Sequence, residues 1–213
     1  MNIAPPLRFV LIGDSITEWG RPRAGTPGHD TALGHGYVAR VAVGLREQWP
    51  DQPVEVLNRG VGGHTVRDLA ARWDADVLQL QPDWLSVMIG INDVWRFFDP
   101  ARRAEAVPPE EYEQTLDLLI SLARPVVRQV VILTPFYVEP DRADPMRRRM
   151  DEFGAIAARV ARRHHTRFVD VQAVIDDLLR TQRPEDVAHD QVHVGDAGHA
   201  AIAAALLQVV GRP

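Results

Sequence analysis

The sequence predicts an α/β protein with three layers, in which a mostly parallel sheet lies between helices. Short runs rich in β-branched residues alternate with longer helical patterns along the 213 residues, as in βαβ units. Most of the short runs are apolar throughout, which is expected of strands covered on both faces. No repeat or linker interrupts this order, so we expect a single domain spanning residues 1–213.

The individual elements follow from the same patterns. Five runs are predicted strands: Leu7–Ile12, Val54–Leu57, Trp84–Ile89, Gln129–Leu133 and Arg167–Val171. Six segments are predicted helices: Gly36–Gln48, Thr65–Leu80, Pro109–Ala123, Pro145–His164, Gln172–Arg180 and Asp196–Val210. Thr65, Pro109 and Asp196 are residue types favoured where helices begin. The proline-rich segments 99–109 and 139–145 predict surface loops.

Composition narrows the range of functions. The chain has no cysteine, and all 24 of its basic residues are arginine, which excludes thiolate nucleophiles and lysine Schiff bases. The net charge of -5 argues against nucleic acid as a partner. The longest apolar stretch, near Ala200–Leu207, is too short to cross a membrane, and the N-terminus has no signal-peptide pattern. We therefore expect a cytoplasmic protein with no membrane partner.

Ser15 is the candidate nucleophile. Ligands of doubly wound sheets bind at the carboxyl ends of the strands. Of the three serines, Ser86 lies in an apolar run and Ser121 on a predicted helix, whereas Ser15 follows the first strand behind a Gly-Asp pair that suits a tight turn. A serine at this point could instead cap the helix that follows.

Other strand ends, and the segment before the last predicted helix, carry the groups that such a nucleophile requires. A serine hydroxyl needs a base, and the base needs a third group to fix its tautomer, which His193 and Asp190 supply within one turn. Acyl transfer also develops an oxyanion. Its candidate donors are the backbone N–H groups of Ser15 and Gly63 and the side-chain amide of Asn92. The pairs around Gly63 and Asn92 are each common in turns and caps, so neither is specific alone.

Four blocks of this sequence resemble the GDSL/SGNH hydrolases, in the order that the family has them. They are Gly13-Asp14-Ser15, the Asn58–Thr65 block with Gly63, Gly90-Ile91-Asn92-Asp93 and Asp190-Gln191-Val192-His193. The resemblance implies the SGNH hydrolase fold, a flavodoxin-like α/β/α sandwich around a mostly parallel five-stranded sheet. It implies Ser15 as nucleophile, His193 as general base and acid, and Asp190 as its orienting partner. It also implies Ser15, Gly63 and Asn92 as oxyanion donors, and no cofactor or metal.

Further segments resemble the bacterial acetylxylan esterases of that family, which implies the removal of acetyl groups from xylo-oligosaccharides. These segments are 34–38, 65–69, 90–96, 134–137 and 144–148. Two residues depart from the family pattern. His64 stands where Asp or Asn is more frequent, and His189 stands where an aromatic residue is expected. Both lie beside the predicted site, so they bear on the choice of substrate more than on the chemistry.

Several residues are candidates for contact with the sugar: Asp14, Trp19, Trp95, Tyr137 and His189. Aromatic rings stack on sugar faces, and Arg21, Arg23 and Arg96 could donate to sugar hydroxyls. Each ring could equally cover the sheet edge or an oligomer contact. No segment of the sequence can be identified as lining a long apolar groove for an acyl chain, which favours a short acyl group. The aromatic and arginine-rich loops, together with the family likeness, also lead us to expect a homo-oligomer.

Three alternatives remain open from the sequence. The string from His189 to His193 is near the spacing of helical zinc ligands, although Val192, Val194 and Gly195 disfavour a helix there. The chain could be a carbohydrate-binding protein that has kept an esterase fold. The same site could also serve a lysophospholipase or thioesterase that acts on longer acyl esters.

Overall fold

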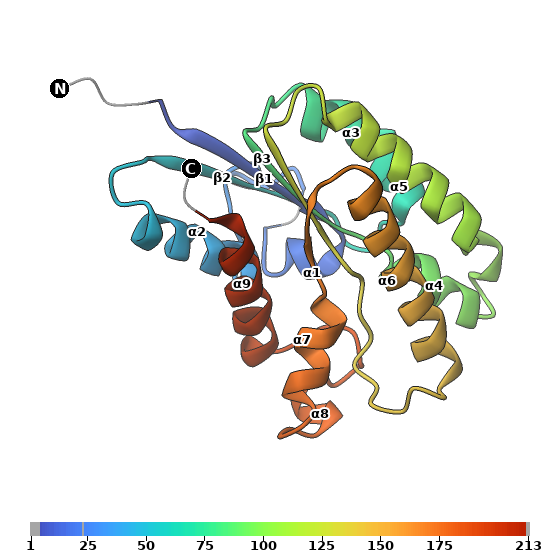
Figure 1. Cartoon of the computed structure of the whole chain (residues 1–213). Helices are drawn as coiled ribbons and strands as arrows, with labels where there is room; N and C mark the ends of the chain where they lie inside the picture. The colour runs from blue at the N-terminus through green and yellow to red at the C-terminus, as the bar shows by residue number, and fades with distance from the viewer. Residues whose placement is uncertain (1–4, 23, 212–213) are drawn as a thin grey trace.

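The sheet has five parallel strands in the order β2-β1-β3-β4-β5. The computed structural model describes residues 5–22 and 24–211, and Figure 1 shows the strands crossing its centre. Their bounds are β1 (Leu7–Gly13), β2 (Val54–Gly60), β3 (Trp84–Met88), β4 (Gln129–Leu133) and β5 (Arg167–Val169). This is the flavodoxin-like order, whose direction of winding changes between β1 and β3. The predicted fold class is confirmed.

Helices cover both faces of the sheet (Figure 1). α2 (Tyr37–Gln48) and α9 (Asp196–Val210) pack together on one face. α3 (Val66–Trp73), α5 (Pro109–Ala123) and α6 (Pro145–Arg163) lie side by side on the other. The shorter elements are α1 (Ser15–Glu18), α4 (Ile91–Phe98), α7 (Val171–Leu178), α8 (Pro184–Val187), a π-helical turn (Asp74–Leu78) and a 3-10 turn (Arg103–Glu105). No helix in the described part of the chain is long and apolar enough to span a bilayer.

The structure differs from the sequence prediction at the ends of several elements. β2 continues to Gly60 because its last three residues pair with the end of β1. β5 stops at Val169 because the Asp170 carboxylate accepts a hydrogen bond from the amide of Ala173 and so caps α7. The predicted helix 65–80 is α-helical only to Trp73 and continues as the π-helical turn. The sequence pattern gives no bounds for the helix after Ser15, which is α1, and does not predict α4 or α8.

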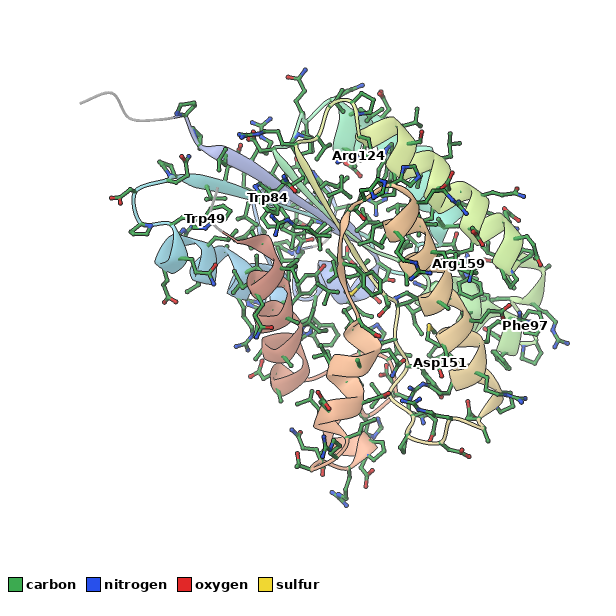
Figure 2. The ribbon with its side chains drawn as sticks, viewed as in Figure 1. Trp49, Trp84, Phe97, Arg124, Asp151 and Arg159 are labelled. Carbon is green, nitrogen blue, oxygen red and sulfur yellow. The ribbon has the colours of Figure 1, made fainter. Side chains whose placement is uncertain are left out.

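The two ends of the sheet differ in chemistry. Where β3 begins, Trp84 packs against Phe9 and Trp49, with ring centroids 5.8 and 6.1 Å away, and Figure 2 shows Trp49 and Trp84 near this end. Burial of aromatic side chains of this size stabilises a fold by about 1.5–3 kcal/mol each. At the opposite end, Gly13 pairs with both Gly60 and Met88, so the carboxyl ends of β1, β2 and β3 are level. The loops that follow these strands therefore meet.

Gly90 turns the chain from β3 into α4. Its φ is +135°, and a Cβ at this position would lie 2.9 Å from Cγ of Pro135. The preceding carbonyl, of Ile89, accepts a hydrogen bond from the Tyr112 hydroxyl at 2.9 Å. Gly90 therefore allows α4 to start directly at the sheet edge, which leaves Asn92 in its first turn.

We expect Gly90→Ala to lower the free energy of unfolding by roughly 1–3 kcal/mol, because an L side chain is strained at this φ. Urea denaturation would measure the change. Gly154→Ala is the matched control. Gly154 lies within α6, and a Cβ there would be at an ordinary 3.6 Å from the side chain of Thr134. Because alanine has a higher helix propensity than glycine, this variant should be more stable by up to about 1 kcal/mol. Equal stability of the two variants would contradict the strain argument.

Candidate active site

Ser15 is presented at the tip of β1. It is the first residue of α1, and the Asp14 carboxylate caps this helix by accepting a hydrogen bond from the amide of Ile16 at 3.0 Å. The buried Asn58 at the end of β2 ties α1 to the sheet, because its amide donates to the carbonyl of Thr17 at 2.7 Å. The position of Ser15 is thus set by two neighbouring strands.

Three of the predicted site residues form one row of hydrogen bonds. Ser15 Oγ lies 2.8 Å from Nε2 of His193, although 178 positions separate the two residues in the sequence. Nδ1 of the same ring lies 2.6 Å from Oδ2 of Asp190. Because the carboxylate holds a proton on Nδ1, Nε2 of the neutral imidazole can accept the proton of Ser15. The arrangement therefore has the connectivity of a Ser-His-Asp triad.

The geometry also keeps Asp190 charged. Its Oδ1 accepts hydrogen bonds from the amides of His193 at 2.7 Å and Val192 at 3.1 Å. Desolvation raises the pKa of Asp190, but the hydrogen bonds from His193 and Val192 outweigh it, so the pKa lies below its ordinary value. A carboxylate in this state can orient the imidazole and stabilise the imidazolium that forms during acyl transfer.

The turn that carries Asp190 and His193 is held by the loop after β4. Gln191 has a φ of +61°, which is uncommon for a residue with a side chain. Its carbonyl accepts from the amide of Val138 at 2.8 Å, its side-chain oxygen accepts from the Tyr137 hydroxyl at 2.7 Å, and its amide donates to Glu139 at 3.0 Å. We call these contacts the Gln191 clamp. The sequence analysis missed Gln191 and considered Tyr137 only as a sugar contact.

The predicted oxyanion donors follow three adjacent strands: Ser15 begins α1 after β1, Gly63 lies in the loop after β2, and Asn92 lies in α4 after β3. Gly63 has a φ of +78°, and no atom lies within 4 Å of the point where its Cβ would be, so this side of the loop is open. The side-chain amide of Asn92 donates to the carbonyl of His64 at 3.0 Å, which joins α4 to the Gly63 loop. Within residues 5–22 and 24–211, the amides of Ser15 and Gly63 have no hydrogen-bond acceptor. They are thus available to bind an oxyanion.

Three arginines brace the strand ends around the site. Arg72 donates to the carbonyls of Arg59 and Gly13 at 2.7 and 2.8 Å. Arg21 donates to the carbonyl of Gly60 at 2.8 Å, and Arg96 donates to that of Gly63 at 2.5 Å. Two arginines considered for sugar binding, Arg21 and Arg96, thus hold backbone in this structure. The third, Arg23, lies outside the described residues.

His64 is held in one tautomer beside the oxyanion loop. Nε of Arg72 donates to Nδ1 of His64 at 3.1 Å, which places the proton of the neutral imidazole on Nε2. Burial, and then the charge of Arg72, lower the pKa of His64. At neutral pH His64 is therefore an uncharged hydrogen-bond donor.

Two buried carboxyl groups lie close behind the site residues. Asp14 is 1% exposed, and Asp93 is fully buried and accepts from the amide of Val66 at 3.0 Å, at the start of α3. Burial raises the pKa of each carboxyl from 3.8 to about 7. Asp14, considered as a sugar contact, thus has its carboxylate inside the protein as a helix cap.

The remaining candidates for sugar contact lie on the surface. The side chains of Trp19 and Trp95 are 39% and 40% exposed, and His189 is exposed as well. His189 and His193 lie in a turn rather than a helix, so they lack the helical geometry of paired zinc ligands. Within the described residues, no group of three His, Cys, Asp or Glu side chains could hold a metal ion.

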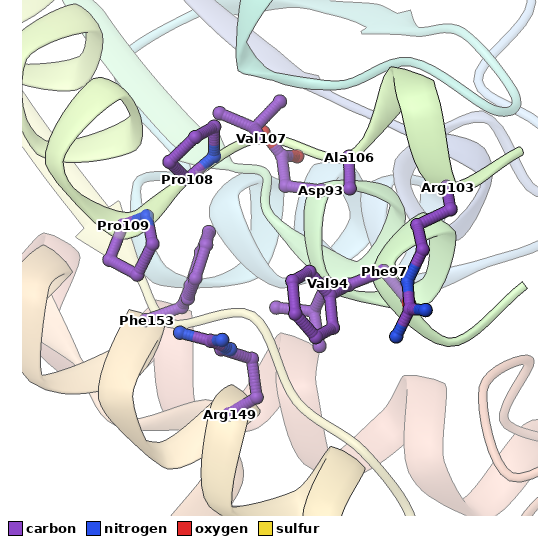
Figure 3. A pocket seen from close by; sticks show the side chains of 10 residues that line it. All are labelled: Asp93, Val94, Phe97, Arg103, Ala106, Val107, Pro108, Pro109, Arg149 and Phe153. Atoms are coloured by element: carbon purple, nitrogen blue, oxygen red, sulfur yellow. The ribbon is translucent and has the colours of Figure 1, made fainter.

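A cavity of about 420 Å³ lies between α4 and α6 (Figure 3). Its lining includes Val94, Phe97, Arg149 and Phe153, together with Asp93 next to Asn92. Ser15, His193 and Asp190 do not line it. The cavity is therefore behind the helix that carries Asn92 and is not a pocket for the acyl group of an ester at Ser15.

The chain is similar to known esterases both in sequence and in structure. The sequence model of the GDSL-like Lipase/Acylhydrolase family matches residues 11–201. An acetylxylan esterase of Geobacillus stearothermophilus is 44% identical over 99% of this chain and 97% of its own. The crystal structure of Axe2, an acetylxylan esterase from that organism, aligns with a TM-score of 0.91 at 43% identity, covering 100% and 98% of the two chains.

Further solved structures are similarly close. LAE5, an alpha/beta hydrolase from the metagenome of Lake Arreo, Spain, aligns with a TM-score of 0.89 at 43% identity, covering 99% of this chain and 98% of its own. Structures of Axe2 also include three variants described as catalytic mutants, in which a serine, an aspartate or a histidine is replaced by alanine.

We expect Asp93→Asn to remove part of the pH dependence of stability. A carboxyl whose pKa is raised in the folded protein stabilises the fold below the unfolded pKa of 3.8, and this contribution is lost as the pH rises through about 7. Between pH 5 and 8.5 the free energy of unfolding of the wild type should therefore fall by about 2–3 kcal/mol more than that of Asp93→Asn.

Urea denaturation at several pH values would measure the difference. Asp177→Asn, which removes a carboxylate whose side chain is 79% exposed, is the control and should leave the pH dependence as in the wild type. Parallel curves for Asp93→Asn and the wild type would contradict the raised pKa.

Proposed function

Because the chain belongs to the GDSL-like lipase/acylhydrolase family, we propose that it is a serine esterase that removes acetyl groups from carbohydrate, with acetylated xylo-oligosaccharides as the substrate class. The observation that carries the chemistry is the row of hydrogen bonds from Ser15 through His193 to Asp190. The likeness to an acetylxylan esterase over nearly the whole chain supports the substrate class.

In the first half of the reaction, Ser15 becomes acylated. Nε2 of His193 takes the proton of Ser15 as Oγ attacks the ester carbonyl carbon. The carbonyl oxygen gains negative charge, and the amides of Ser15 and Gly63 and the side chain of Asn92 donate to it. When the tetrahedral intermediate collapses, the bond to the sugar oxygen breaks, and that oxygen takes the proton from His193.

In the second half, water replaces the sugar. Nε2 of His193 removes a proton from water, whose oxygen attacks the acetyl carbon on Ser15. The same donors stabilise the second oxyanion, and each is worth roughly 10²–10³ in rate. Acetate then leaves, and Oγ of Ser15 regains its proton from His193. Asp190 stays ionised throughout and stabilises each imidazolium.

We expect Ser15→Ala to abolish acetate release from acetylated xylo-oligosaccharides, because no other group can form the acyl-enzyme. Asp190→Asn should lower kcat by about 10⁴, since it leaves His193 in the wrong tautomer. Acetate assay, with NMR of the sugar product, would measure both effects. Asp186→Asn, an exposed carboxylate paired with Arg183, is a control that should retain activity.

The same assay distinguishes the other candidate substrates. Activity on aryl esters that peaks at octanoyl or longer would favour a lysophospholipase or thioesterase and contradict the acetyl preference. Sugar binding without turnover that depends on Ser15 would favour a carbohydrate-binding protein. Activity lost with a chelator and restored by zinc would favour a metal site at His189 and His193.

We also propose that the protein is a cytoplasmic homo-oligomer. Three exposed apolar side chains support self-association: Leu118, Leu122 and Val126, of which the first two lie four residues apart on α5 and the third just beyond its end. Light scattering at micromolar concentration should therefore give a mass that is a multiple of the monomer. A particle with the mass of one chain would contradict the proposed oligomer. The variant Leu118→Glu places a charge among these apolar side chains and should weaken the association.

A further inference from the structure

We propose that Trp19 is a positioning residue for His193, whose indole face holds the imidazole flat and stabilises its protonated form. This inference rests on the proposed function of His193 as the base. Trp19 directly follows α1, four positions after Ser15. Its ring lies 5.6 Å from the ring of His193, centroid to centroid, with 24° between the two planes.

Stacking of this kind matters most when His193 carries a proton. A cation within about 6 Å of the face of a Trp ring is attracted by the negative charge of the π system. His193 becomes such a cation each time it takes a proton from Ser15 or from water. The indole therefore favours the charged intermediate over the neutral resting state. It cannot take the proton itself, so the proton stays available to the leaving group.

The indole also packs against a buried histidine on α9. The ring of His199 lies 5.5 Å from that of Trp19 and is 1% exposed. Its Nδ1 accepts a hydrogen bond from the amide of Tyr37 at 3.2 Å, which fixes the ring and places the proton of the neutral form on Nε2. The carbonyl of Trp19 accepts from the amide of His35 at 2.9 Å. Trp19 thus has ring contacts with His193 and His199 and a backbone hydrogen bond to His35.

The two histidines differ in charge for a physical reason. Burial, and then the charge of Arg40, lower the pKa of His199 to about 4. His199 is therefore neutral while His193 works, so it supports Trp19 without repelling the imidazolium. The other titratable groups that act on His193 are Asp190, which bonds to it, and Asp14, buried behind Ser15. The charged carboxylate of Asp190 stabilises the imidazolium, and Trp19 adds a contribution that does not titrate.

The sign of one measurement separates this proposal from a purely structural role. If Trp19 only shielded His193 from water, its removal would hydrate the imidazolium and raise the pKa of His193. If the indole face binds the cation, replacement by an apolar residue without a π system lowers that pKa. Trp19→Leu keeps an apolar cover and removes the π system, whereas Trp19→Phe keeps a weaker one.

The pKa of His193 in both variants can be followed by NMR of the ring carbons in protein labelled at histidine. We expect Trp19→Leu to lower it by about half a pH unit and to lower kcat for an aryl acetate about threefold, with KM little changed. Trp19→Phe should recover part of both effects. Phe98→Leu, which removes a ring of equal exposure on α4, should leave the His193 pKa unchanged.

An unchanged or raised His193 pKa in Trp19→Leu would overturn the proposal. So would a rise in KM with kcat unchanged, which would make Trp19 a substrate contact alone. Because Trp19 is partly exposed, both variants should fold, and circular dichroism would verify this. The NMR measurement needs no turnover. An inactive wild type whose His193 pKa still responds to Trp19 would reject the proposed function and not this inference.

Discussion

The hydrogen bond between Ser15 and His193 depends on the register of the parallel sheet. Gly13 pairs with Gly60 on one side and with Met88 on the other, which makes the ends of β1, β2 and β3 level. A shift of one strand by a single residue would carry its loop about 3.3 Å along the strand, which is more than a hydrogen bond can tolerate. Ser15 and the Gly63 and Asn92 segments therefore take their positions from backbone pairing.

Buried polar groups transmit this register to the side chains. Asn58 ties α1 to β2, Asp93 caps α3 from the first turn of α4, and Arg72 bonds to carbonyls on β1 and β2. Such groups are costly to bury unless they are paired, and each of these is paired with backbone. These hydrogen bonds keep loops from separate strands in fixed relation at this edge of the sheet.

The strands were predictable from local signals, and the row of Ser15, His193 and Asp190 from local signals together with the resemblance of four sequence blocks to a known family. Apolar runs mark strands, a Gly-Asp-Ser turn marks the nucleophile, and three-residue spacing allows Asp190 to reach the ring of His193. Other features depend on contacts between distant segments and leave no local pattern. The stacking of Trp19 on His193, the positive φ of Gln191 and the use of Arg21 and Arg96 as backbone braces are of this kind. The start of α4 could not be predicted from the sequence, because glycine, which stands at its N-cap as Gly90, is more typical of a turn.

The Gln191 clamp bears on the temperature at which the protein loses activity. It fastens the turn of Asp190 and His193 to the loop after β4, whereas Ser15 begins α1 directly after the central strand β1. Loops of this type open locally at a lower free energy than core strands. Warming would then separate base from nucleophile while the secondary structure is still intact. The temperature at which activity is lost would then lie below the melting temperature. Strengthening the Gln191 clamp would raise that temperature without changing the core.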